Sequence, residues 1–131
     1  MKSIKYVLPG NPIAWTRAVP NYGKHRMYDS QKNVRLIIGI EIQKQHGTAP
    51  NFEGAIALEA YYYFKPPQRC NPDKLPEWHL TKPDTSNLTK LYEDILSCDL
   101  GIIKNDSMIC KEYCEKRYSL EPKTIIILTE L

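Results

Sequence analysis

Hydrophobic residues recur along the chain with two periods, and these periods define the expected elements. An aliphatic run over 4–8 predicts a first strand, which the following prolines end. A helix is predicted from a cap at Asp29 or Ser30 to about residue 46, where Gly47 offers a stop. The residues that give this helix an apolar face are Val34, Ile38 and Ile42.

Three further segments follow from the same patterns. Aliphatic and aromatic residues fill 55–64, which predicts a well-buried second strand. The stretch 65–81 is dense in proline and polar residues and predicts a long loop, a feature that is more often functional than incidental. Hydrophobic positions with helical spacing predict a second helix over about 87–98.

The last two strands are predicted over about 107–118 and 124–131. Glu121 and Pro122 mark a turn between them, so we expect an antiparallel hairpin. The resulting order, β-α-β-α-β-β, predicts an α+β fold with a mixed β-sheet packed against two helices. A length of 131 residues suits a single domain over 1–131.

Composition adds little about function but limits the class of protein. With 42% hydrophobic and 25% charged residues, the chain has ordinary globular composition. The net charge of +3 is too small to indicate a polyanionic partner, so any such partner must be inferred from how the charges are distributed. The sequence has neither a run of about 20 apolar residues nor a signal-peptide core, so we expect a cytoplasmic protein without a membrane partner.

The four cysteines are Cys70, Cys98, Cys110 and Cys114. A reducing compartment disfavours disulfides, and the sequence has no C-x-x-C pair of the kind typical of zinc sites. We therefore expect small, partly buried side chains. A zinc site built from three of these cysteines and His79 stays open as an alternative.

The second predicted helix carries polar side chains on one face. Asn87, Lys90 and Asp94 fall within about 60° of one another around the helix axis. Asp84 precedes the helix, and Asp106 opens the next strand, so both carboxylates have a route to the same face. Such a cluster suits phosphodiester hydrolysis, because carboxylate oxygens bind Mg²⁺ and an ammonium stabilises negative charge. An Asp84 helix cap with a Lys90–Asp94 ion pair explains the same spacing without catalysis.

A second candidate surface is the loop over 11–28. It carries Arg17, Lys24 and Arg26 among aromatic residues, a combination that suits contact with phosphates and exposed bases. The alternative is a solvated connection whose aromatic side chains pack on the core.

These motifs resemble those of the RusA family of Holliday junction resolvases. That family carries a pattern close to P-D-x-D-N-x-x-K, an acidic residue four positions later and a D-D-S step. This chain has PDTSNLTK over 83–90, then Asp94, then Asn105-Asp106-Ser107. The opening PGNP over 9–12 and Arg17 also resemble the family's N-terminal pattern.

The resemblance implies a crossover junction endodeoxyribonuclease that serves DNA recombination and repair. Such an enzyme is a homodimer that binds branched DNA and makes paired, symmetric, Mg²⁺-dependent nicks in four-way junctions, with Mn²⁺ as a substitute ion. A two-fold dimer matches the two-fold symmetry of a junction. The chain is similar to phage or prophage members of the family, which implies the cytoplasm of a bacterial host.

Carried over by position, the family's roles fall on the polar helix face. Asp84 and Asp106 become metal-binding catalytic carboxylates, and Lys90 becomes the catalytic lysine. Asp94 is the third expected metal ligand. The residues expected to support the site are Ser86 and Asn87. The residues expected to contact DNA are Arg17, Lys24, Arg26 and Lys82.

Two positions depart from the family pattern. Ser86 stands where the family usually has a second aspartate, and Asn105 replaces the first aspartate of the D-D pair. The loss of a carboxylate at Ser86 predicts weaker Mg²⁺ binding, for which Asp94 or Glu93 would have to compensate. An alternative function is therefore a catalytically weak or inactive junction-binding protein. A third is a zinc-held interaction module, suggested by Cys110 and Cys114.

Overall fold

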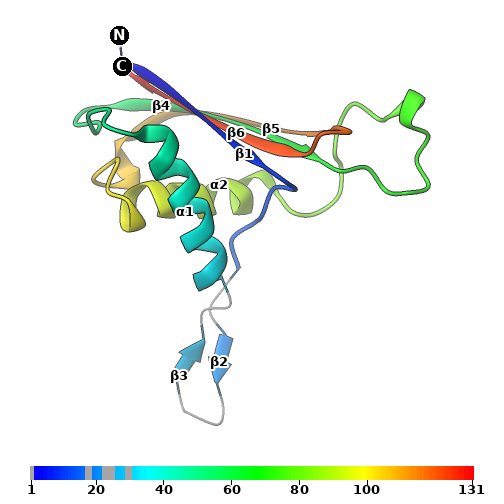
Figure 1. Cartoon of the computed structure of the whole chain (residues 1–131), viewed down its shortest axis with the longest axis horizontal. Helices are drawn as coiled ribbons and strands as arrows, with labels where there is room; N and C mark the ends of the chain where they lie inside the picture. The colour runs from blue at the N-terminus through cyan, green and yellow to red at the C-terminus, as the bar shows by residue number, and fades with distance from the viewer. Residues whose placement is uncertain (1, 17–18, 22–25, 29–30) are drawn as a thin grey trace.

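A mixed four-stranded sheet forms one layer of the protein, and two helices cover one of its faces (Figure 1). The computed structural model describes the backbone of residues 2–16, 19–21, 26–28 and 31–131, and the side chains of 2–16 and 31–131. The strand order is β1 (Ser3–Pro9), β6 (Lys123–Glu130), β4 (Ile56–Phe64) and β5 (Ile109–Tyr118). β4 and β5 run parallel, whereas β6 is antiparallel to both β1 and β4. The predicted α+β fold is confirmed.

The predicted hairpin between the last two strands is wrong. β6 pairs with β1 and β4, so β4 separates it from β5. The connection crosses the end of β4, where the backbone N–H of Ser119 donates to the carbonyl oxygen of Phe64 at 2.9 Å. Alternate residues of β4 are fully buried, and a buried strand needs a hydrogen-bonded neighbour on each side. A turn signal alone does not tell which neighbour the next strand takes.

Helix α1 (Lys32–His46) ends at Gly47, whose positive φ of 57° is the expected glycine stop. Ile42 is buried and Val34 and Ile38 are half-buried, so the predicted apolar face packs against the sheet. The proposed caps Asp29 and Ser30 lie outside the described residues.

Helix α2 (Thr85–Asp94) begins two residues earlier than predicted and continues into a π-helical turn, η2 (Ile95–Asp99). Its apolar side is almost completely buried under the sheet, as predicted. The residues on that side are Leu88, Leu91, Tyr92, Ile95 and Leu96. Gly101, with a φ of 65°, follows the turn.

The long loop after β4 contains one short 3-10 helix, η1 (Pro72–Lys74), and is otherwise irregular, as predicted. A second 3-10 turn, η3 (Asp106–Met108), precedes β5. The N-terminal stretch predicted as a loop contains a two-stranded sheet of β2 (Val19–Asn21) and β3 (Arg26–Tyr28). Its sequence lacks the apolar alternation that announces a strand.

The two faces of the main sheet differ. Even-numbered residues of β1, β4 and β6 point toward the helices and form the core with the apolar side of α2. Figure 1 shows no helix on the opposite face. No described helix has both the length and the apolar character needed to cross a bilayer.

Candidate functional site

The chain reaches helix α2 through a segment that is tied to strand β5. The Lys116 ammonium donates to the carbonyl oxygens of Thr81 and Pro83, at 2.7 Å and 2.8 Å. The backbone N–H of His79 donates back to the carbonyl oxygen of Lys116 at 3.1 Å. These bonds fix the residues immediately before Asp84, so the helix head has a defined place beside β5.

Asp84 occupies the N-cap position of α2, but its carboxylate makes no capping hydrogen bond to the described residues. The side chain is exposed, as are those of Ser86 and Asn87 in the first turn. The helix N-terminus therefore presents an uncommitted carboxylate to solvent. The predicted N-cap position of Asp84 is confirmed, but its side chain caps no backbone N–H of the described residues.

The other half of the non-catalytic explanation is confirmed, because Lys90 and Asp94 form an ion pair with an N–O distance of 3.5 Å. The Lys90 ammonium also lies 5.2 Å from the centre of the Trp15 ring. Trp15 is fixed by its backbone N–H, which donates to the carbonyl oxygen of Asn87 at 2.9 Å. Lys90 therefore lies between an aromatic face and a carboxylate, on the predicted polar face.

Hydrogen bonds to the sheet hold helix α2 in place. The Thr89 hydroxyl lies 2.8 Å from the Tyr62 hydroxyl on β4 and 3.1 Å from the Cys114 sulfur on β5. Burial raises the pKa values of both Tyr62 and Cys114, the latter to about 11. Because the neighbour of Thr89 in sequence is Lys90, these contacts fix the position of the lysine's backbone.

Acidic side chains gather at the C-terminal end of α2. Burial raises the pKa of Glu93 to about 8, with further contributions from a hydrogen bond to Glu112 and from the charges of Asp106 and Asp94. Like charges raise one another's pKa only at short range. Asp94 and Asp106 therefore both lie near enough to Glu93 to act on its pKa, and Glu112 bonds to it. Asp84 is not among the groups that act on Glu93.

The chemistry of this cluster fits a divalent cation, because hard carboxylate oxygens are the ligands that such ions prefer. Among the described residues, no three His, Cys, Asp or Glu side chains already converge as a metal cage. One oxygen of the Asp94 carboxylate is engaged by the Lys90 ammonium. The described carboxylates are therefore of the chemical type that suits a divalent cation, but their arrangement does not form a complete metal site.

The structure gives the zinc alternative no support. Cys98 and Cys110 are exposed, Cys70 and Cys114 are half-buried, and all four thiols are free. The raised pKa of Cys114 disfavours the thiolate that zinc requires. His79 stacks on the Phe64 ring, with ring centres 4.1 Å apart.

The sequence analysis missed Glu112 and Lys116. Both lie on β5, whose even-numbered side chains contact α2 and its approach segment. Polar residues occur on both faces of this edge strand, so alternation could not identify the inward face. The available signal was the presence of charged residues, Glu112 and Lys116 among them, in the strand that was predicted to follow the acidic helix.

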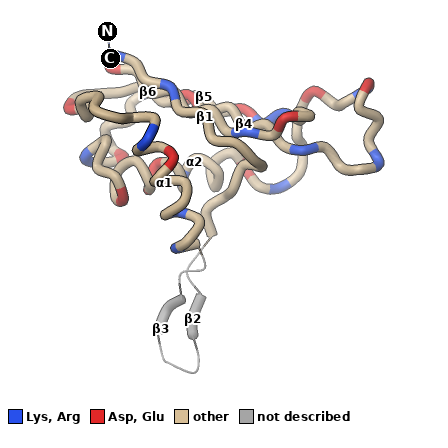
Figure 2. The backbone as a smooth tube through the Cα atoms, viewed as in Figure 1, with Lys and Arg blue, Asp and Glu red and all other residues tan. Residues whose placement is uncertain are grey.

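Charged residues lie along the chain that leads to this site. Figure 2 shows Lys and Arg, interspersed with Asp and Glu, along the loop between β4 and α2. Lys82, predicted to contact DNA, is exposed two residues before Asp84. The other exposed cations of this loop are Lys65, Arg69 and Lys74. Arg17 and Lys24 lie outside the described residues, and of Arg26 the structure describes the backbone in β3.

One comparison with known proteins identifies a family. The family model described as Endodeoxyribonuclease RusA matches residues 9–129. This range contains every element from β4 to β5, both helices, and all the site residues discussed above. None of the proteins with curated descriptions matches the chain.

Proposed function

We propose that this chain, which belongs to the RusA family of endodeoxyribonucleases, resolves four-way DNA junctions by paired, symmetric, Mg²⁺-dependent nicks as a homodimer. Members of this family are divalent-metal-dependent nucleases that act on branched DNA. The observation that carries the proposal is the polar face of α2, which has an uncommitted Asp84 at its N-terminal end, Lys90 along its length and the carboxylates around Glu93 at its C-terminal end.

Asp106 would hold Mg²⁺ together with either Asp84 or Asp94, because Asp84 and Asp94 stand at the two ends of α2, about 15 Å apart along its axis, and one ion does not bind both. Glu93 would be a further oxygen donor beside Asp94 and Asp106. A bound Mg²⁺ supplies an activated water and neutralises charge that builds on the phosphate. As a ligand, Asp94 would turn away from Lys90, which would free the ammonium.

Lys90 then has a direct role. Its ammonium, packed beside the Trp15 ring, is available to the scissile phosphate once Asp94 no longer holds it. A preorganised cation stabilises the charge that develops on the phosphoryl oxygens or the leaving oxygen. The anchoring of Thr89 keeps Lys90 in this position.

The exposed cations between β4 and α2 supply the affinity for DNA. Lys65, Arg69, Lys74 and Lys82 would contact phosphates, which orient the substrate but do not select its sequence. Arg17, Lys24 and Arg26 are proposed to extend this contact from the N-terminal side. Junction selectivity follows from the placement of two such surfaces in a dimer.

The second candidate function is a junction-binding protein with weak or no cleavage. Ser86 favours it, because this exposed, neutral side chain stands where the family usually has a carboxylate. Glu93 and Glu112 favour the active enzyme, because they add carboxylate oxygens, the ligands that Mg²⁺ prefers, beside Asp94 and Asp106.

The test is cleavage of a labelled synthetic four-way junction beside a linear duplex of matched sequence, with Mg²⁺, with Mn²⁺ and with EDTA. An active resolvase nicks the junction symmetrically, requires the metal, and loses activity in Asp84→Asn and Lys90→Met. Tight junction binding without nicking would instead establish the binding protein. Equal cleavage of duplex and junction would contradict both.

A further inference from the structure

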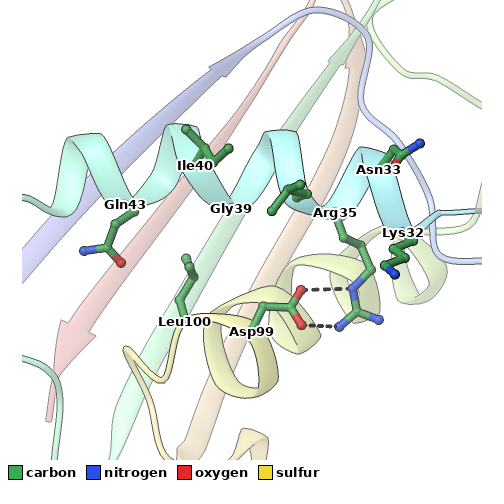
Figure 3. Close-up of a pocket in the computed structure, with 9 residues that line it drawn as sticks. Lys32, Asn33, Arg35, Gly39, Ile40, Gln43, Asp99 and Leu100 are labelled. Carbon is green, nitrogen blue, oxygen red and sulfur yellow. Dashed lines mark hydrogen bonds and ion pairs between the residues drawn. The ribbon is translucent and has the colours of Figure 1, made fainter.

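Exposed large apolar side chains lie close together in sequence at two places in the described part of the chain. One is helix α1, where Ile37 and Ile40 are exposed and Ile40 borders a groove beside the π-helical turn (Figure 3). The other is the segment before α2, where Trp78 is 44% and Leu80 is 88% exposed. This second pair precedes Asp84 by six and four residues, so it belongs to the approach to the candidate active site.

Strand β5 holds the Trp78 ring in place. Trp78 forms an antiparallel bridge with Arg117, and the centre of its ring lies 4.1 Å from the guanidinium carbon of that arginine. Arg117 is itself fixed by ion pairs with Glu77 and Glu115, each with an N–O distance of 3.0 Å. A fixed cation therefore supports the indole ring, whose exposed part is preorganised to stack on another flat group.

The backbone on both sides of Leu80 is also held. On one side, buried His79 donates its backbone N–H to the carbonyl oxygen of Lys116 and stacks its ring on Phe64. On the other side, the carbonyl oxygen of Thr81 accepts a hydrogen bond from the Lys116 ammonium at 2.7 Å. The protein thus presents an apolar side chain to solvent from a fixed backbone, where burial against another molecule would be favourable.

The charges of this loop favour nucleic acid as the molecule that covers the pair. Residues 65–82 carry four exposed cations and two exposed carboxylates, which are Lys65, Arg69, Lys74, Lys82, Asp73 and Glu77. The cations attract phosphates, while aromatic rings and leucine side chains contact the faces of bases. In an intact duplex each base face is covered by the next base pair, whereas the stack is interrupted at a branch point.

We infer that Trp78 and Leu80 bind the faces of DNA bases at the branch point, and so contribute to the selectivity of the protein for branched DNA. Four residues of chain place Leu80 at most about 14 Å from Asp84, which corresponds to about four base steps. The inference rests on the proposed function, in which Asp84 acts on the DNA backbone, and it adds a contact with bases to the symmetry of the dimer. Stacking tolerates every base, so this contact selects DNA structure and not DNA sequence.

The test compares binding of a four-way junction with a fixed branch point and of a linear duplex of matched sequence, by fluorescence anisotropy in EDTA. We expect Leu80→Gln and Trp78→Ala each to weaken junction binding about tenfold, the effect of losing one stacking contact, and to leave duplex binding unchanged. Leu80→Met and Trp78→Phe keep an apolar or aromatic surface and should bind nearly as the wild type does. Leu131→Gln is the matched control, because Leu131 is 53% exposed at the opposite end of the sheet. Circular dichroism verifies that each variant is folded.

A fluorescent adenine analogue at the branch point reports the contact directly, because its emission changes when its stacking changes. Saturating wild type should change this emission in the junction but not in the duplex, and Leu80→Gln should remove most of the change. Equal losses of affinity for junction and duplex, an unchanged affinity and emission in Leu80→Gln, or a wild type that binds both DNAs equally would overturn the inference. A wild type that gives the emission change but never cuts the junction would refute the proposed function and leave the base contact established.

Discussion

The ammonium of Lys116 lies 2.8 Å from the carbonyl oxygen of Pro83, the residue directly before Asp84. Its second bond, to the carbonyl oxygen of Thr81, makes a two-point clamp from β5 onto the approach to α2. A metal-binding carboxylate has to be positioned within a fraction of an ångström. Lys116 is therefore a positioning residue, which acts on Asp84 through the backbone.

The clamp predicts that Lys116→Met lowers kcat for junction cleavage about tenfold to a hundredfold, because small displacements of catalytic groups have effects of this size. Lys111→Met, on the same strand and exposed, is the control and should leave kcat unchanged. Single-turnover cleavage rates at saturating enzyme provide the measurement. If Lys116→Met instead weakens only DNA binding and reduces its salt dependence, Lys116 is a phosphate contact and not a clamp.

Ser86 determines how much activity the site retains. Ser86→Asp adds the carboxylate that the family pattern has at this position, beside exposed Asp84 at the helix head, and should increase cleavage at limiting Mg²⁺ by at least about tenfold. The control is Ser86→Asn, which adds similar volume without charge and should give no increase. Initial rates over a Mg²⁺ titration separate tighter metal binding from faster chemistry. An unchanged titration for Ser86→Asp would show that the glutamates already supply the missing charge.

The local elements could be predicted from sequence because their periods are clear. The apolar side of α2 and the polar face that carries Lys90 and Asp94 follow from 3.6-residue spacing, and the structure confirms both. The buried strand β4 was likewise evident from its composition. These features depend on neighbours in the sequence.

The parts that could not be predicted depend on residues far apart in the chain. The position of β6 between β1 and β4 depends on pairing with two strands that lie far from it in the sequence, and the local sequence carries no signal of this pairing. Glu112 joins the acidic group only because the parallel pairing of β4 and β5 places it over α2. The face of α1 that packs on the core, with Val34, Ile38 and Ile42, was predicted, but the exposed apolar residues Leu36, Ile37 and Ile40 on the same helix were not identified.

The raised pKa of Glu93 predicts how stability depends on pH. Between its ordinary value of 4.5 and its value of about 8, the folded chain retains a proton that the unfolded chain has released. The metal-free free energy of unfolding should therefore fall as the pH rises through this window and level off above it. Urea unfolding across the window measures this decline, which Glu93→Gln should reduce.

Two conditions serve as controls for the pH measurement. Glu121→Gln, an exposed change in the turn before β6, should keep the wild-type decline. Saturating Mg²⁺ should flatten the wild-type curve, because the metal binds the deprotonated carboxylates and offsets their repulsion. A decline that persists unchanged in Glu93→Gln would assign it to another group and would remove this argument for a crowded acidic site.

The N-terminal cations predict the salt dependence of junction binding. Each phosphate contact contributes about 0.9 to the slope of log affinity against log salt, so Arg17→Gln with Arg26→Gln should lower the slope by about 2. Lys5→Gln is the control, because Lys5 is exposed on β1 and belongs to no proposed DNA surface. Fluorescence anisotropy with a labelled junction, in EDTA to prevent cleavage, measures binding at several salt concentrations. A double variant with weaker binding but an unchanged slope would mean that these arginines support the fold of the N-terminal segment, and that phosphate contact comes from the loop that carries Lys82.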